Sequence, residues 1–63
     1  MREYWQLDFY VNDIKKTRYL FGTEAAANRR FKKYKYENKD LKKMSKSKVE
    51  YLKNEKKAHF IEL

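Results

Sequence analysis

The amino-terminal residues alternate between apolar and polar side chains. Between residues 3 and 11 the apolar positions are Trp5, Leu7, Phe9 and Val11, and the positions between them are Tyr4, Gln6, Asp8 and Tyr10. Successive side chains of a β-strand point to opposite faces, so this period predicts a strand with one buried face. The aromatic and β-branched residues of the segment are also typical of strands.

Residues 16–21 repeat this alternation and predict the return strand of an antiparallel hairpin. The alternating sets are Thr17, Tyr19 and Phe21 on one side, and Arg18 and Leu20 on the other. Asn12 and Asp13 supply turn chemistry between the two strands. Because Ile14 and Lys15 follow before the second strand, the predicted loop is longer than two residues.

A helix is predicted over residues 24–37. Thr23 is a suitable N-cap, and Glu24 places a negative charge at the positive end of the helix dipole. Three alanines follow, which are the strongest helix formers. Asn38 tolerates the left-handed conformation and is predicted to end the helix. Gly22, the only glycine, stands where strand changes into helix, so a special backbone conformation or close packing is expected there.

The predicted helix has one face for the core and one basic face. The core face contains Ala27, Phe31, Tyr34, Asn38 and Leu41. The opposite face contains Arg29, Lys32, Lys33 and Tyr36, and its flanks contain Arg30 and Lys35. Such a helix buries the first face on a sheet and leaves the second in solvent.

The carboxy-terminal third supports two interpretations. Residues 39–47 are polar and basic and are expected to form a loop or an extension of the helix. Residues 49–52 and 58–63 fit two short strands around a turn, which is favoured because the last residues alternate. A second helix is the alternative, because a rough helical stripe passes through Leu41, Met44, Val49 and Leu52.

Together these elements predict a single small α+β domain over residues 1–63. Its antiparallel sheet consists of the hairpin and, in the favoured interpretation, one or two carboxy-terminal strands. The sheet packs against one central helix in the order ββα(ββ). The residues expected in the core are Trp5, Leu7, Phe9, Phe21, Ala27, Phe31 and Tyr34.

The composition narrows the class of protein. The chain has no cysteine, so disulfides and thiolate metal sites are not expected. No apolar run is long enough for a signal peptide or a membrane span. With Met1 taken as a true start, the chain is interpreted as a complete small cytoplasmic protein.

The positive charge is concentrated in one part of the chain. The formal net charge is +8, and residues 29–48 contain ten basic residues against Glu37 and Asp40. Such a field attracts polyanions, although a solvated lysine-rich face is the simpler explanation. We predict a phosphate-binding strip that consists of Arg29, Lys32, Lys33 and Tyr36, supported by Lys39, Lys42 and Lys43.

A second surface is predicted on the sheet face that the helix leaves uncovered. Its exposed residues are expected to be Tyr4, Gln6, Tyr10 and Arg18. Aromatic residues and arginine are enriched at interface centres, so this face could bind nucleic acid or protein. A solvated sheet, or a face covered by the second copy of a homodimer, explains the same residues equally well.

Catalytic chemistry is not indicated. His59 is the only histidine and lies in an apolar segment, where packing or solvent exposure is its ordinary role. The nine carboxylates show no paired spacing, and neither a glycine-rich phosphate loop nor a metal-ligand cluster is present. We therefore expect no enzyme activity, no cofactor and no metal site.

The run YWQLDFYVNDIKKTRYLFGTEAAANRRF resembles a pattern in small, mostly uncharacterised proteins of bacteriophages and mobile elements. The residues that carry this resemblance are Trp5, Phe9, Phe21, Thr23, Glu24 and Ala26. The layout is also similar to the amino-terminal arm-binding domain of tyrosine recombinases, which reads DNA with its sheet. Lys16, Arg18 and Phe21 match that domain's basic second strand, and residues 23–25 match its helix start, whereas the glycine usual in its hairpin turn is missing.

Two functions follow from these features. The first is a small basic nucleic-acid-binding accessory protein, which contacts phosphates mainly without sequence specificity. The second is a small phage-type interaction protein that binds and modulates a host protein, with an acidic surface as the partner. Binding that weakens strongly with salt and tolerates many sequences would distinguish the first from the second.

Overall fold

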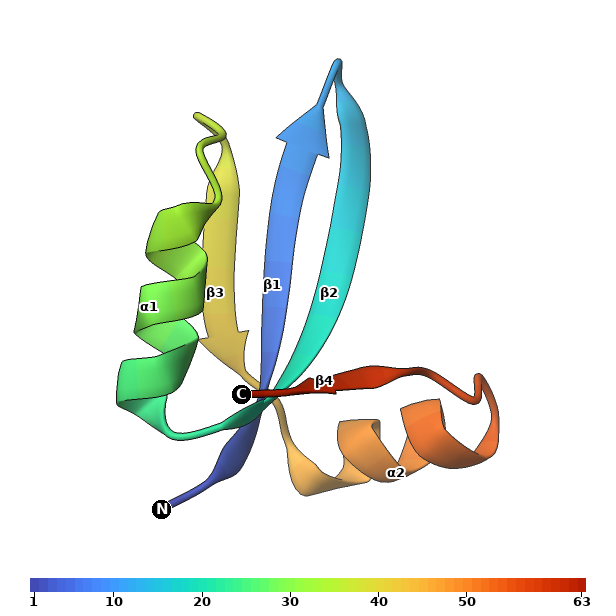
Figure 1. Cartoon of the computed structure of the whole chain (residues 1–63). Coiled ribbons are helices and arrows are strands. Elements are labelled where there is room, and N and C mark those ends of the chain that lie inside the picture. The colour runs from blue at the N-terminus through green and yellow to red at the C-terminus, as the bar shows by residue number, and fades with distance from the viewer.

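A long β-hairpin forms the centre of the sheet in the computed structural model, which describes residues 1–63 (Figure 1). β1 (Glu3–Val11) and β2 (Ile14–Gly22) pair antiparallel along their whole length. Asn12 and Asp13 alone make the turn, with φ angles of 51° and 65°. Positive φ at both central residues is the geometry of a type I′ hairpin turn, and Asn and Asp tolerate this conformation. The predicted longer loop is therefore wrong.

Two further strands complete a mixed four-stranded sheet in the order β3-β1-β2-β4. β3 (Lys39–Lys43) runs antiparallel to β1, whereas β4 (Phe60–Glu62) runs parallel to β2. The expectation of a purely antiparallel sheet is therefore wrong at β4. β4 is parallel to β2 because the chain crosses from one edge of the sheet to the other before β4 pairs. Residues 39–43 form a strand and not the loop or helix extension that their polarity suggested.

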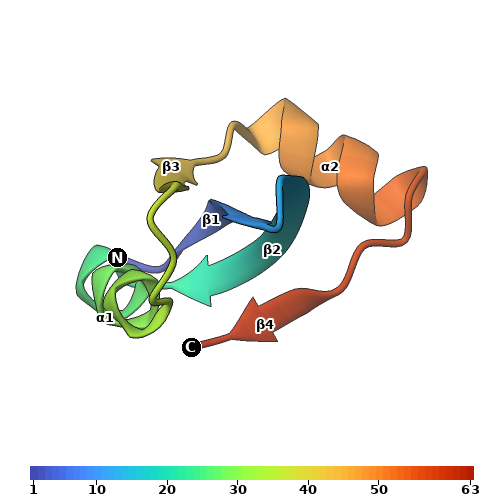
Figure 2. The same ribbon diagram turned by 90° about the horizontal axis from the view of Figure 1, so that it is seen from above.

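The connection between the two outer strands contains α2 (Lys46–Asn54). Residues 49–52 are therefore helical, as the alternative interpretation had it, while the last residues form a strand. α2 and α1 (Glu24–Lys33) lie on opposite faces of the sheet (Figure 2). The single central helix of the prediction is thus replaced by one helix on each face. Neither helix is long and apolar enough to cross a membrane.

Alternation along the strands supplies side chains to two separate cores. The core beside α1 contains Trp5, Leu7, Phe9, Leu20 and Ala27. The core beside α2 contains Met44, Val49 and Leu52, and the residues packed against it are Tyr4, Tyr19, Ala58 and Phe60. Of the predicted core residues, the structure buries Trp5, Leu7, Phe9 and Ala27 and half-buries Phe31 and Tyr34.

Phe21 lies on the opposite face from the one predicted. The two-residue turn sets a register in which Trp5 pairs with Leu20 and Tyr4 pairs with Phe21. Directly paired residues share a face of the sheet, so Leu20 enters the α1 core and is fully buried. The ring of Phe21 instead lies 4.5 Å from that of Tyr4 on the α2 side. Alternation along β2 shows that Leu20 and Phe21 face opposite sides of the sheet. The register with β1 decides which of them enters the α1 core.

α1 begins where the sequence predicts and ends earlier. The side chain of Thr23 caps its start by accepting the N–H of Ala26 at 3.2 Å. The helix ends at Lys33, because the chain must turn back to place β3 beside β1. The predicted end at residue 37 is therefore wrong, and Leu41 lies in β3 and not on the helix.

Close packing explains Gly22. Its φ is not positive, so its backbone conformation is an ordinary one. A Cβ atom at this position would lie 2.8 Å from the Cβ of Leu63, which is too close for an unstrained contact. The carbonyl of Gly22 also accepts the indole N–H of Trp5 at 3.0 Å. The end of the hairpin is thus packed tightly between the α1 core and the carboxy terminus.

Candidate nucleic-acid interface

The structure divides the predicted phosphate-binding strip. The exposed surface of α1 carries Arg29, Lys32 and Lys33. Tyr36 lies beyond the end of the helix and does not share its basic face. The three supporting lysines lie on β3, where Lys42 faces the α2 side of the sheet because it pairs with Gln6.

Lys39 and Lys43 have partners within the protein. The ammonium group of Lys39 donates to the carbonyls of Phe31 and Tyr34 at 3.0 and 2.7 Å. These carbonyls belong to the end of α1, so Lys39 acts as a side-chain cap for the helix. Lys43 forms an ion pair with Glu3 at 2.7 Å. An external phosphate would have to compete with these contacts.

An open hollow at the end of α1 brings cations and tyrosines together. It has a volume of about 460 Å³ and is lined by Arg30, Lys33, Tyr34, Lys35 and Tyr36. None of these residues is acidic, and neither of the two salt bridges in the structure involves them. We call this site the basic hollow. Its three positive charges are available to an external anion.

Phe9 of β1 supports both tyrosines of the basic hollow. The ring of Tyr36 stacks on that of Phe9, with the centroids 4.8 Å apart and the planes inclined by 17°. The ring of Tyr34 lies 4.9 Å from Phe9 and is tilted by 54°. Phe9 is 4% exposed, whereas Tyr36 is 40% exposed. A buried strand residue thus holds an exposed aromatic ring in a defined orientation.

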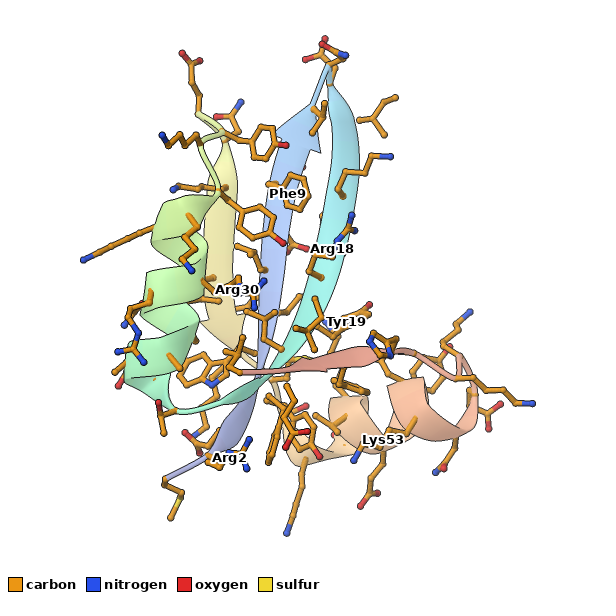
Figure 3. All side chains as sticks on the ribbon, viewed as in Figure 1. Arg2, Phe9, Arg18, Tyr19, Arg30 and Lys53 are labelled. Carbon is orange, nitrogen blue, oxygen red and sulfur yellow. The ribbon has the colours of Figure 1, made fainter.

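Two residues of β2 extend this surface across the sheet. Arg18 pairs with Leu7 and therefore shares a face with Phe9, and its guanidinium carbon lies 5.5 Å from the centre of the Phe9 ring. Lys16 pairs with Phe9 and lies on the same face. Figure 3 shows Phe9 with Arg30 on the side of α1 and Arg18 on the side of β2. Positive charge therefore flanks the aromatic rings on both sides.

Much of the negative charge lies elsewhere. A second open hollow, of about 550 Å³, is lined by Asp8, Tyr10, Asp13, Glu37, Asn38, Lys39 and Asp40. Asp8 and Asp40 pair across β1 and β3 and face the α2 side of the sheet, opposite to Phe9. The carboxylates are not grouped in a way that could hold a metal ion. The sheet thus separates these two carboxylates from the basic hollow.

The second predicted surface is not assembled as one patch. Tyr4 is half-buried beside α2, where its ring lies 5.2 Å from Phe60 and its hydroxyl accepts a hydrogen bond from Lys53 at 2.8 Å. Tyr10 is 44% exposed on the same face of the sheet. Arg18 is on the opposite face, since it pairs with Leu7. It belongs instead to the surface around Phe9.

Several residues of the basic hollow had other expected roles. The sequence pattern predicted Tyr34 in the core, and Arg30 and Lys35 on the flanks of the basic face. Phe9, which supports the hollow from β1, was also expected in the core. A sequence signal was present, because residues 32–36 read KKYKY and interleave lysines with tyrosines. This interleaving is typical of surfaces that bind nucleic acid. The contact between Tyr36 and Phe9 had no signal in the sequence.

The comparisons with known proteins give no relative for this chain. No protein-family model, curated protein or solved structure matches it. The resemblance to phage proteins and to the recombinase domain therefore stays a prediction. The geometry of the basic hollow and the surface around Phe9 carries the functional argument.

Proposed function

We propose that the protein is a small basic nucleic-acid-binding accessory protein that contacts phosphates around the basic hollow. The observation that carries this proposal is the lining of the hollow, in which Arg30, Lys33 and Lys35 stand beside two tyrosines without a carboxylate. Lysine and arginine neutralise phosphates and release their counterions, and aromatic rings stack on bases. Both chemistries are present in one site.

The electrostatics support binding with little sequence preference. The net charge of +8 attracts any polyanion and accelerates its association with the protein. Lys33 and Lys35 are exposed, so their flexible ammonium groups suit phosphates better than base edges. Contacts to phosphates position a protein on nucleic acid but carry no sequence information. We therefore expect similar affinities for oligonucleotides of different sequence.

The test is the salt dependence of oligonucleotide binding, followed by fluorescence anisotropy. Each phosphate contact adds about −0.9 to the slope of log affinity against log salt for duplex DNA, and about −0.7 for single strands. Combining Lys33→Ala with Lys35→Ala should weaken binding evenly across sequences and make the slope shallower by up to about 2. Folding should be unchanged, because both side chains are exposed.

A matched control removes the same charge from the other side of the molecule. Lys46 and Lys56 are exposed residues at α2 and just after it, and neither has a hydrogen-bond or salt-bridge partner for its ammonium group. The double change of these lysines to alanine should alter the slope less than the change in the basic hollow. Absence of binding to DNA and RNA at low salt would contradict the proposal, and an acidic host-protein surface would then be the partner to test.

A further inference from the structure

We infer that the basic hollow binds single-stranded nucleic acid, with one unpaired base stacked on the ring of Tyr36. This inference rests on the proposed function and names the class of nucleic acid that it concerns. Its starting point is the position of Tyr36, which the structure places on Phe9 and not on the helix.

The ring of Tyr36 has one occupied face and one available face. Phe9 covers the first, since the two rings are nearly parallel at a centroid distance of 4.8 Å. Tyr36 is nevertheless 40% exposed and lines the basic hollow. The exposed area of Tyr36 therefore lies outside the ring face that Phe9 covers. A flat base could extend the stack of Phe9 and Tyr36 by one more ring.

The packing around Phe9 orients Tyr36 before any ligand binds. Phe9 is buried in the central strand, and Tyr34 contacts it from the same loop that carries Tyr36. The two tyrosine rings also lie 6.3 Å from each other. A ring that is already held in place loses less conformational entropy on binding than a free side chain does. Tyr36 is therefore better suited to stacking than an isolated surface tyrosine.

The positive charges near Tyr36 suit the phosphate groups of a nucleotide whose base is stacked on the ring. Arg30, Lys33 and Lys35 line the same hollow, so phosphates on either side of a stacked base can reach a cation. Aromatic platforms inside basic grooves are the usual means by which proteins hold single strands without reading sequence. In a duplex each base is stacked between its neighbours and has no free face for Tyr36. The site therefore favours unpaired strands.

The experiment compares three ligands of equal length with the wild-type protein at one salt concentration. They are an oligothymidylate, the same strand with abasic sites throughout, and a duplex. The abasic strand keeps the phosphates and lacks the bases. Loss of one base–aromatic stack should weaken binding of the abasic strand by about 5-fold to 150-fold relative to oligothymidylate.

Variants assign this difference to Tyr36. Tyr36→Leu should weaken oligothymidylate binding by a similar factor and leave binding of the abasic strand unchanged, whereas Tyr36→Trp should retain the preference for bases. The control is Tyr51→Leu, which changes a tyrosine that is 51% exposed on α2 and should have no effect. Circular dichroism checks that each variant is folded. The abasic comparison itself needs no variant.

Two outcomes separate the inference from the proposed function. Equal affinities for the three ligands, together with unchanged binding by Tyr36→Leu, would overturn the inference while phosphate binding stands. Binding to none of them at low salt would overturn the proposed function and the inference with it. Retention of poly-glutamate in that case would identify an acidic protein as the class of partner.

Discussion

At the scale of single residues, Asp8 shows how the α2 side of the sheet accommodates a buried charge. The residue is 6% exposed, and its carboxylate accepts hydrogen bonds from the amide of Gln6 at 3.0 and 2.9 Å and from the hydroxyl of Thr17 at 2.8 Å. Lys48 of α2 donates in turn to the amide oxygen of Gln6. Burial raises the pKa of Asp8, but the hydrogen bonds and two nearby lysines outweigh burial and hold it below its ordinary value of 3.8.

Asp8 should make the stability of the protein depend on pH in acid. Because its pKa is lower in the folded chain, the unfolded chain takes up the proton first, and the free energy of unfolding decreases as pH falls below about 4. Asp8→Asn removes this titration and should flatten that dependence. The substitution should also lower stability at neutral pH. Both carboxylate oxygens of Asp8 accept from the amide NH₂ of Gln6, so the NH₂ group of Asn would face another donor in either orientation. Urea unfolding followed by the fluorescence of Trp5 across the acid range measures both effects.

Lys39 is expected to contribute to stability more than to binding. Lys39→Met removes both hydrogen bonds to the end of α1, and we expect a loss of about 1–2 kcal/mol in the free energy of unfolding. The control is Lys42→Met in the same strand. Lys42 attracts the carboxylate of Asp8 but makes no hydrogen bond to the end of α1, so this change should cost less. Chemical denaturation measures the difference. A large change in the salt slope of binding with unchanged stability would instead place Lys39 on the phosphate contact surface.

At the scale of elements, β4 is short and depends on contacts beyond its own hydrogen bonds. It spans three residues and pairs with β2, and the N–H of Leu63 donates to the carbonyl of Phe21 at 2.9 Å. The side chain of Leu63 then packs against Gly22, where no room remains for a Cβ atom. The position of the carboxy-terminal strand therefore depends on the absence of a side chain at the end of the hairpin.

Gly22→Ala should test this dependence. The added methyl group would overlap the Cβ of Leu63, and overpacking of this kind costs about 1–3 kcal/mol. Leu63→Gly removes the overlapping atom, so the double variant should lose less stability than the sum of the two single changes. A double-mutant cycle of urea unfolding measures the coupling. Additive losses would show that Leu63 is not the cause of the strain.

At the scale of the whole molecule, the two faces of the sheet carry different chemistry. The α2 side holds the buried polar network of Asp8 and an apolar core of its own. The α1 side holds the basic hollow and the cations beside Phe9. We therefore expect loss of nucleic-acid affinity from changes on the α1 side, namely the double change Lys33→Ala with Lys35→Ala and the single change Tyr36→Leu. Equivalent changes at Lys46, Lys56 and Tyr51 should matter less for binding.

The sequence by itself determined the elements with strong local signals. Alternation defined both strands of the hairpin, and Thr23 with the following alanines defined the start of α1. These signals are local because the period of a strand and the cap of a helix depend on neighbouring residues. The α+β class and the basic surface of α1 followed from them, as did most of the core beside α1, whereas the core beside α2 did not.

Tertiary structure decided the features that depend on residues far apart in the chain. The pairing of β3 with β1 ended α1 early, and the hairpin register turned Phe21 away from the α1 core. The crossing through α2 made β4 parallel. The same pairing of β3 with β1 placed the loop between α1 and β3 over Phe9, where Tyr36 stacks. Such contacts depend on how the strands pair across the sheet, and a local sequence period does not encode that pairing.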